Sequence, residues 1–263
     1  MIEPFEVFAL HYAQHSGRSD AENFLGGDPH DSGSDLAYFV WVARRSDRLY
    51  IIDTGFGEMS AARRGRTLFA RPADLIAGLG IAPAQVTDVI LTHLHYDHAG
   101  TLADFPAARF HVQDGEVGFA TGRCMCHPMF SAPYDVEDVV GLVRKVYAGR
   151  VVFHDGDAAL CDGLSLHRVP GHTAGLQVVR IWTARGWIVL ASDASHLYAN
   201  LAQRRPFSIV HEPAALLEGY RRLLDLAGSP DAIIPGHDPE VARLYPPHPD
   251  AARVSRLHLP PIS

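Results

Sequence analysis

Short apolar runs that end in glycine, proline, aspartate or serine recur along the whole chain, and this pattern predicts a protein rich in β-strands. The first two runs, 36–43 and 49–53, flank a polar turn and predict a β-hairpin. We expect further strands at residues 86–91, 109–113, 151–154, 164–169, 176–182, 187–191 and 232–235. The second half of the chain thus repeats the strand-rich scheme of the first half.

Helical spacing of apolar residues is clearest at 213–227, where Pro213 occupies the first position and Gly228 follows the end. These apolar residues share one face, which we expect to pack on a sheet and to have no role in function. Shorter helices are predicted at 72–80 and from residue 114 onward. Two strand-rich halves, each with helices, predict an α/β protein in which two packed sheets lie between outer helices.

Three stretches of the chain lack a clear period. Residues 11–35 are rich in His, Gly, Ser and Asp, so 1–35 is predicted to be an N-terminal loop region. Residues 246–263 are proline-rich and predict an extended C-terminal tail, and 122–130 predict a loop or an irregular helix. Because 263 residues can bury a full core and no stretch has the composition of a linker, we expect one domain spanning 1–263.

Charge and hydropathy exclude two classes of partner. The chain has 30 acidic and 23 basic residues, a formal net charge of −7, and no block of basic residues, so a nucleic acid is a poor candidate. No apolar run is long enough to span a bilayer, and the acidic start of the chain does not resemble a signal peptide. We therefore expect no membrane association and a cytoplasmic location.

The cysteines support the same compartment. Cys124, Cys126 and Cys161 are odd in number and have no framework spacing, which is typical of a reducing environment. Cys124, Cys126 and His127 could form a metal site, but only three ligands occur there and no matching pair follows. We favour apolar packing for this stretch, as one wall of a substrate pocket.

Candidate metal ligands are most concentrated in residues 91–100, Leu-Thr-His-Leu-His-Tyr-Asp-His-Ala-Gly, at the end of a predicted buried strand. Imidazole and carboxylate are ligands that Zn²⁺, Fe²⁺, Mn²⁺ and Co²⁺ accept. His93, His95, Asp97 and His98 are too many ligands in too short a loop for one tetrahedral centre. The spacing therefore indicates two metal ions.

Three later fragments place one further ligand each at the end of an apolar strand. His172 and His237 each follow a glycine, and Asp193 follows a serine. With the cluster at 91–100 they supply seven ligands, enough for two metals that share a carboxylate. Asp53 ends another strand, where it either caps a turn or orients a metal-binding histidine.

The ordered pattern H-x-H-x-D-H, His, Asp, His resembles the metallo-β-lactamase superfamily from about the first hairpin to residue 238. The resemblance implies an αββα sandwich with the metals at one edge of two mixed sheets. It also implies that His93, His95 and His172 hold one ion, that Asp97, His98 and His237 hold the other, and that Asp193 bridges both. Zinc is the expected metal, with iron, manganese or cobalt as alternatives.

Within the superfamily, the phrases around His93 to Gly100, Pro170 to Gly175 and Ser192 to Ser195 look most like N-acyl-homoserine lactonases. An aspartate at 193, where well-known zinc β-lactamases have a cysteine or lack the bridging ligand, argues against an antibiotic-resistance enzyme. Those lactonases carry a tyrosine three residues after the bridging aspartate. This chain has His196 there, with Tyr198 two residues on.

The resulting hypothesis is a binuclear metal-dependent hydrolase that opens a lactone or related ester by attack of a metal-bridging hydroxide. His196 or Tyr198 would stabilise the oxyanion, and Asp97 would carry the proton to the leaving group. We expect a small, partly apolar substrate, because aromatic and Met residues flank the ligand loops. These are Phe24, Leu25, Met125, Met129, Phe130, Tyr134, Tyr198 and Phe207. The oligomeric state is open, and a homodimer would be compatible.

Other activities compete with this hypothesis. A thioesterase similar to glyoxalase II shares the bridging aspartate, but the basic C-terminal region of that family is not evident, and hydrolysis of another small ester or a cyclic amide is a further alternative. Redox chemistry as in flavoprotein relatives would need a flavodoxin-like domain, for which no residues remain. A non-catalytic scaffold would tolerate missing ligands, whereas all seven are present.

Overall fold

Strand β2 (Leu36–Arg45) lies at the centre of the fold and is buried on both faces. Its sequence, Leu-Ala-Tyr-Phe-Val-Trp-Val-Ala, is a continuous apolar run of the kind that suits a strand covered on both sides. A two-residue turn joins it to the antiparallel strand β3 (Arg48–Ile52), which confirms the predicted hairpin. The computed structural model describes residues 2–262.

The first sheet has the order β13-β1-β2-β3-β5-β6-β7, with β4 also paired to β1. Its antiparallel half contains β1, β2, β3 and β13, and the pairs from β3 through β5 and β6 to β7 are parallel. The remaining strands are β1 (Glu6–His15), β4 (Thr67–Leu68), β5 (Asp88–Ile90), β6 (Arg109–Gln113), β7 (Val151–His154) and β13 (Val254–Arg256). Parallel pairing brings the carboxyl ends of β3 and β5 to the same edge.

The second sheet has the order β12-β11-β10-β9-β8. Its strands are β8 (Ala158–Cys161), β9 (Leu164–Arg168), β10 (Gln177–Thr183), β11 (Gly186–Ser192) and β12 (Ile233–Pro235). All pairs are antiparallel except β11 with β12, which is parallel. The carboxyl ends of β11 and β12 therefore also share an edge.

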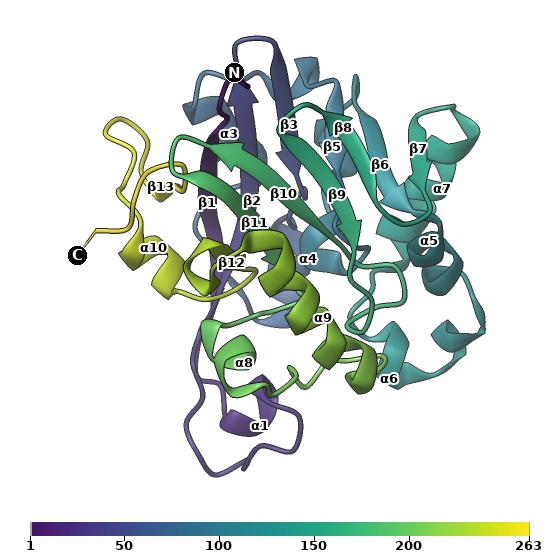
Figure 1. The fold of residues 1–263 in the computed structure, drawn as a ribbon. Coiled ribbons are helices and arrows are strands. Elements are labelled where there is room, and N and C mark those ends of the chain that lie inside the picture. Colours follow the sequence, from purple (N-terminus) through teal and green to yellow (C-terminus); the bar gives the residue numbers. More distant parts are fainter. Residues whose placement is uncertain (1, 263) are drawn as a thin grey trace.

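Alternating residues of the strands divide the apolar side chains into separate cores. In β1, Val7 and Ala9 face the second sheet, whereas Phe8 and Leu10 face the opposite side. The core between the sheets includes Trp41, two cores lie beneath the helices on the outer face of each sheet, and a small fourth one contains Phe24 and Phe207. These layers form the αββα sandwich predicted from the resemblance (Figure 1).

Helix α9 (Pro213–Ala227) covers the second sheet through Leu216, Tyr220 and Leu223, as its apolar face predicts. It ends at Gly228, which adopts a left-handed conformation with φ of 74°. The other helices are α1 (Asp20–Asn23), α2 (Glu58–Arg64), α3 (Pro72–Gly78), α4 (Tyr96–Ala99), α5 (Asp114–Ala120), α6 (Pro128–Ser131), α7 (Val136–Tyr147), α8 (Tyr198–Gln203) and α10 (Glu240–Leu244). Short 3-10 helices occupy Pro83–Gln85, Leu102–Asp104, Arg123–Cys126 and Pro230–Ala232.

The prediction of an N-terminal loop region over 1–35 was wrong in its first half. Residues Glu6–His15 form strand β1, which pairs with β2 along most of its length and has six of its ten residues buried. The polar residues His11, Gln14 and His15 obscured its alternation. Only the part after His15 is irregular, apart from the short helix α1.

The predicted extended tail over 246–263 also needs correction. Residues Val254–Arg256 form strand β13, which pairs with β1 and extends the first sheet. Leu257 is fully buried between the sheets. The irregular character predicted for 122–130 is confirmed, because this stretch contains a 3-10 helix and the start of the four-residue helix α6.

No helix within residues 2–262 combines the length and the apolar character that crossing a membrane would require.

Asp138 in α7 predicts a pH-dependent stability. Burial, with a smaller contribution from Asp135, raises the pKa of Asp138 from 3.8 to about 7, and its Oδ2 has no hydrogen-bond partner within the described residues. The folded state therefore binds this proton more tightly than the unfolded state, and stability is lost as the pH rises from about 4 to about 7. Asp138→Asn should leave the melting temperature unchanged at pH 4 and raise it at pH 8. Glu137→Gln on the exposed face is the control, and an equal effect of Asp138→Asn at both pH values would contradict the prediction.

Candidate metal centre

The seven predicted ligands come from four loops that follow strands at one edge of the two sheets. The loop after β5 carries His93 and His95 and continues into the short helix α4, which holds Asp97 and His98. The other three ligands follow β9, β11 and β12, in the order His172, Asp193, His237. All seven side chains are at least nine-tenths buried. The structure thus brings together residues that are up to 144 positions apart (237 − 93).

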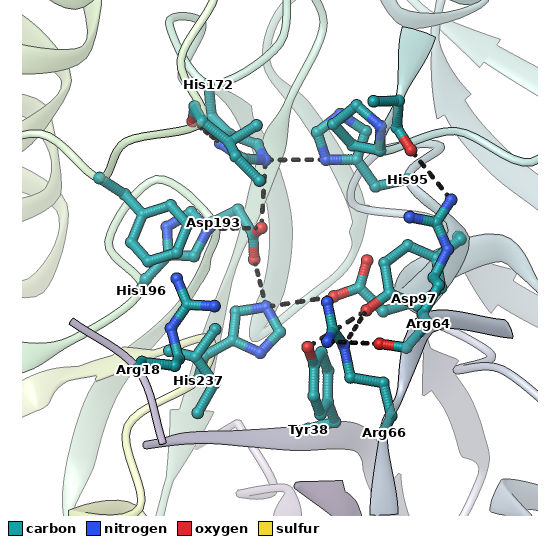
Figure 2. A pocket seen from close by; sticks show the side chains of 16 residues that line it. Arg18, Tyr38, Arg64, Arg66, His95, Asp97, His172, Asp193, His196 and His237 are labelled. Carbon is teal, nitrogen blue, oxygen red and sulfur yellow. Dashed lines mark hydrogen bonds and ion pairs between the residues drawn. The ribbon is translucent and has the colours of Figure 1, made fainter. Parts of the chain in front are cut away.

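The two carboxylate oxygens of Asp193 face two different groups of histidines (Figure 2). Oδ2 lies 3.1 Å from Nε2 of His172 and 3.7 Å from Nε2 of His93. Oδ1 lies 2.9 Å from Nε2 of His237 and 3.2 Å from Nε2 of His98. Each oxygen therefore belongs to a separate cluster of nitrogen atoms.

The remaining two ligands complete these clusters. Nδ1 of His95 lies 2.9 Å from Nε2 of His172, on the Oδ2 side. Asp97 Oδ2 lies 3.7 Å from Nε2 of both His98 and His237, on the Oδ1 side. Ligand atoms around a tetrahedral ion with bonds of about 2.1 Å are roughly 3.4 Å apart, so both clusters have dimensions that fit one ion each.

Hydrogen bonds on the far side of the rings provide an independent test of whether these residues fit metal ions. Nδ1 of His172 donates to the carbonyl of Ile209 at 2.8 Å, and Nδ1 of His237 donates to the carbonyl of Ala37 at 2.9 Å. A neutral ring with a proton on Nδ1 directs the lone pair of Nε2 at the Asp193 carboxylate. Lone pairs that face an anion at about 3 Å require a proton or a cation between them, so the donor set fits a metal.

Buried nitrogens without partners point to the same conclusion. Nε2 of His93 and Nε2 of His98 are buried, and within residues 2–262 neither has a hydrogen-bond partner. Such orphaned atoms are costly in a folded protein unless they coordinate an ion.

The electrostatics of the two sides differ. Burial lowers the pKa of His98, but the carboxylates of Asp193, Asp97 and Asp53 outweigh burial and raise its pKa well above the ordinary value. The pKa values of His93 and His95 are lowered by burial and by the neighbouring imidazoles. Rings with lowered pKa values stay neutral, which is the form that binds a metal.

Asp53, for which the sequence left two roles open, orients a ligand. Its Oδ2 accepts a hydrogen bond of 2.7 Å from Nδ1 of His98, and the side chain is fully buried. The backbone and hydroxyl of Thr92 also donate to Asp53, at 2.7 and 2.8 Å. These bonds fix the ring of His98 and direct its Nε2 toward Asp193.

Glu116 in α5 is a structural residue of the site that the sequence did not reveal. Its buried carboxylate accepts hydrogen bonds from the backbone of Leu94 and from the hydroxyls of Thr173 and Tyr134. It therefore ties the loop of His93 and His95 to the loop of His172. An acidic residue in the first turn of a helix is common, so the sequence contains no signal for this role.

Glycines next to the ligands allow the loops to approach each other closely. A Cβ atom at Gly175 would lie 2.0 Å from the backbone nitrogen of Glu116, and one at Gly236 would lie 2.7 Å from the backbone of Ser192. Only glycine fits at these contacts.

His196 lies at the centre of the site. Its Nε2 is 2.9 Å from Asp193 Oδ2, and its ring stacks on Phe207 with a centroid distance of 3.6 Å. Burial lowers the pKa of His196 to about 3, so the ring is neutral. Nε2, which faces the carboxylate, therefore carries the proton, and Nδ1 has no partner within the described chain.

Tyr198, the other residue predicted to polarise the substrate, lies elsewhere. It lines a different cavity together with Tyr245 and packs against the core between the sheets. The reason is local: helix α8 begins at Tyr198, and the backbone nitrogen of Tyr198 donates to Asp238 at 2.9 Å. The predicted catalytic role of Tyr198 is therefore not supported by its position.

A pocket of about 160 Å³ opens onto the ligands, and Phe207 is the one residue of the predicted apolar lining that reaches it. Met129 and Phe130 line an adjoining recess, while Met125 and Tyr134 line a separate cavity. Cys124 packs against the outer core of the first sheet, as predicted for this stretch. Cys126 is exposed, and within residues 2–262 no metal-like cluster includes Cys124, Cys126 or His127.

Comparison with known proteins defines the family. A model of the metallo-β-lactamase superfamily matches residues 33–243 of the chain. The protein therefore belongs to the metallo-β-lactamase superfamily.

Relatives within the superfamily are metallo-hydrolases. A probable metallo-hydrolase of Mycobacterium tuberculosis is 28% identical over 253 residues, which cover 85% of this chain and 78% of the relative. An N-acyl homoserine lactonase of a Bacillus species is 26% identical over 226 residues, which cover 80% of this chain and 84% of the relative.

Solved lactonase structures share the fold. A quorum-quenching N-acyl homoserine lactone lactonase superposes with a TM-score of 0.75 at 22% identity, over 91% of this chain and 94% of that chain. A dizinc quorum-quenching lactonase superposes with a TM-score of 0.72 at 20% identity, over 90% of each chain. At these identities the solved structures show that the fold is shared.

The contact between Asp53 and His98 generates a prediction about metal affinity. Asp53→Asn replaces a charged acceptor by a weaker one and should lower the affinity for zinc by about ten- to a hundredfold. Competition with a chromophoric chelator measures this change. Asp88→Asn is the matched control, because Asp88 accepts from His111 at 3.1 Å outside the metal cluster. Equal affinities for the two variants would show that Asp53 does not support the ligand.

Proposed function

We propose that the protein is a binuclear metal-dependent hydrolase that opens a lactone or a related small ester. The observation that carries this proposal is the division of the Asp193 oxygens between two histidine clusters, because a carboxylate in that position can bridge two ions. His93, His95 and His172 would hold one ion, and Asp97, His98 and His237 the other. The lactonase relatives support a cyclic ester as the substrate.

Two divalent ions in this position would supply a hydroxide at neutral pH and would polarise the carbonyl group. The protein supplies the surroundings. Its ligand loops are held together by hydrogen bonds to Glu116, Asp53 and backbone carbonyls, so the ligands are fixed before the substrate arrives.

His196 is the proposed oxyanion donor. Its neutral ring carries Nε2–H, which lies 2.9 Å from Asp193 Oδ2 and would also donate to the carbonyl oxygen of a bound ester as that oxygen gains negative charge. Stacking on Phe207 fixes the plane of the ring. His196 would thus take the role that a tyrosine has in the lactonases that the sequence resembles.

Asp97 is the proposed proton carrier. Its carboxylate lies 3.7 Å from Nε2 of His98 and of His237 and lines the pocket, and its side chain is 10% exposed. The backbone of Asp97 is fixed, because the hydroxyl of Tyr12 donates to the Asp97 carbonyl at 3.0 Å. From this position Asp97 can pass a proton to the leaving oxygen of the substrate.

Asp193 provides the main test of the two-metal proposal. Asp193→Ala removes the shared ligand and should reduce bound metal from two ions to one or fewer per chain, and turnover by at least about a hundredfold. Metal analysis of the purified protein and a pH-drop assay over lactones, aryl esters and thioesters measure both quantities. Full metal loading with unchanged hydrolysis would overturn the proposal.

His196 separates catalysis from metal binding. His196→Ala should lower kcat by about a hundred- to a thousandfold, the usual loss of an oxyanion donor, while the metal content stays at two ions. Tyr198→Phe is the control, because Tyr198 lies outside the pocket. If His196→Ala instead loses a metal, His196 is a ligand, in agreement with its position 2.9 Å from Asp193, and the oxyanion role is wrong.

A further inference from the structure

Three arginines line the same pocket as the metal ligands. Arg18 lies between β1 and α1, Arg64 ends α2, and Arg66 follows two residues later. In Figure 2, Arg18 lies beside His237 and Arg66 beside Tyr38, whereas His172 and His95 lie on the opposite side of the pocket. The pocket therefore has a cationic side.

Arg64 and Arg66 lack the carboxylate partners that arginines on the protein surface have, and Arg18 has only a distant one. Within residues 2–262, Arg64 and Arg66 have no carboxylate oxygen within 4.0 Å, and the nearest one to Arg18 is Glu22 at 3.9 Å. In contrast, the exposed Arg71 pairs with Asp104 at 3.0 Å, and Arg63 pairs with Asp135. Arg64 and Arg66 thus have no ion pair with a neighbouring side chain, and Arg18 has one long ion pair.

Neutral groups hold the three guanidinium groups in place. Arg18, whose side chain is 7% exposed, donates to the side chain of Asn23 at 2.6 Å and to the carbonyl of Glu22 at 2.6 Å. Arg66 donates from Nε to the hydroxyl of Tyr96 at 3.1 Å and from Nη1 to the carbonyl of Arg64 at 2.7 Å. Nη2 of Arg66 has no acceptor within the described residues. Fixed guanidinium groups with free N–H donors are suited to bind carboxylate or phosphate.

The titratable groups around the arginines offset their charge only in part, because Glu22 acts on Arg18 and Asp97 acts on Arg66. Burial, then the charges of Arg66 and Arg18, lower the pKa of His15 to about 4, so this ring is neutral. Asp97, whose charge raises the pKa of Arg66, belongs to the proposed metal cluster. Tyr38 and Tyr96 have raised pKa values through burial and stay neutral. Glu22 and Asp97 are the carboxylates that act on these arginines, so a ligand that supplies a further anion would form charge-assisted hydrogen bonds with the N–H donors that remain.

The opposite side of the pocket is apolar. A recess of about 230 Å³ adjoins the site at His95 and His172 and is lined by Phe119, Met129 and Phe130. It contains none of the three arginines. A substrate whose ester group lies at the metals could therefore place an apolar end in this recess and a charged end at the arginines.

We propose that the substrate of this site is an anionic ester or lactone, with a carboxylate or phosphate group that Arg66 and Arg18 bind and an apolar part that enters the recess at Phe119 and Phe130. This inference rests on the proposed hydrolase function and defines its substrate class. In the reaction, water adds across the acyl carbon–oxygen bond and yields a carboxylic acid and an alcohol. The anionic group takes no part in bond breaking.

Matched esters test the proposal. The zinc-loaded enzyme is assayed with mono-4-nitrophenyl adipate, with the same compound in which the free carboxylate is a methyl ester, and with the corresponding phosphonate. We expect kcat/KM to be about ten- to a hundredfold higher for an anionic ester than for the neutral one, the size of a hydrogen bond to a charged group. The ratio should fall at high salt. A larger gain for the carboxylate or for the phosphonate identifies the group that the site prefers.

Variants assign the effect to the arginines. Arg66→Met should reduce the ratio between anionic and neutral esters to near one, and Arg66→Lys should retain part of it. The ratio is measured within one protein, so partial loss of folded enzyme does not change it. Arg63→Met removes the same charge from the neighbouring helix, outside the pocket, and should keep the ratio of the wild type. A wild-type ratio near one, or an equal fall in Arg63→Met, would overturn the proposal.

Binding separates this proposal from the hydrolase function. Calorimetry with the amide analogues of the anionic and neutral esters gives the same ratio without turnover. If the anionic amide binds at least tenfold more tightly and neither ester is hydrolysed, the hydrolase function is wrong and the anion site stands. If both esters are hydrolysed at equal rates and both amides bind equally, the hydrolase function stands and the anion site is wrong.

Discussion

The buried carboxylate of Asp193 is surrounded by imidazole nitrogens on both of its oxygens, and the rest of the site depends on this arrangement. Four of these nitrogens lie between 2.9 and 3.2 Å from it, those of His98, His172, His196 and His237. Such a dense group of polar atoms, removed from water, is stable only when each atom has a partner. Outward hydrogen bonds occupy Nδ1 of three of these rings, so the inward nitrogens are left for cations.

The sandwich supplies the rigidity that this group requires. Strand ends from both sheets meet at one edge, and backbone hydrogen bonds connect their loops. For example, His237 donates from its backbone to the carbonyl of His196 at 2.9 Å, and Gln177 donates to the carbonyl of Thr92 at 2.9 Å. Glu116 and Asp53 add buried carboxylates that join separate loops. The two sheets and these hydrogen bonds fix the ligand side chains a few ångströms apart. Metal ions are therefore not needed to bring the ligands together.

In the proposed function, the metal ligands carry out the hydrolysis, and other residues of the pocket select the substrate. The proposed ligands lie in loops at the ends of the strands, whereas the three arginines and the recess at Phe119 belong to other loops and short helices around them. Loops can change while the strand ends stay fixed, so one metal centre can serve different substrates. Three arginines that line the pocket, together with the apolar recess at Phe119, would select molecules that carry an anionic group at one end only.

From the sequence alone one can predict most of the strand pattern, the helix at 213–227 and a set of candidate metal ligands, because each of these is a local property of a few neighbouring residues. The period of apolar positions located most strands, and the density of His and Asp in residues 91–100 indicated metal chemistry. The sequence did not reveal β1 and β13, because polar residues interrupt β1 and β13 is very short. The tertiary structure decided everything that depends on distance. It brought Glu116 and Asp53 behind the ligands, turned Tyr198 away from the pocket and His196 into it, and gathered three arginines from separate segments. Contacts of this kind join residues far apart in the chain, so no local pattern of the sequence can contain them.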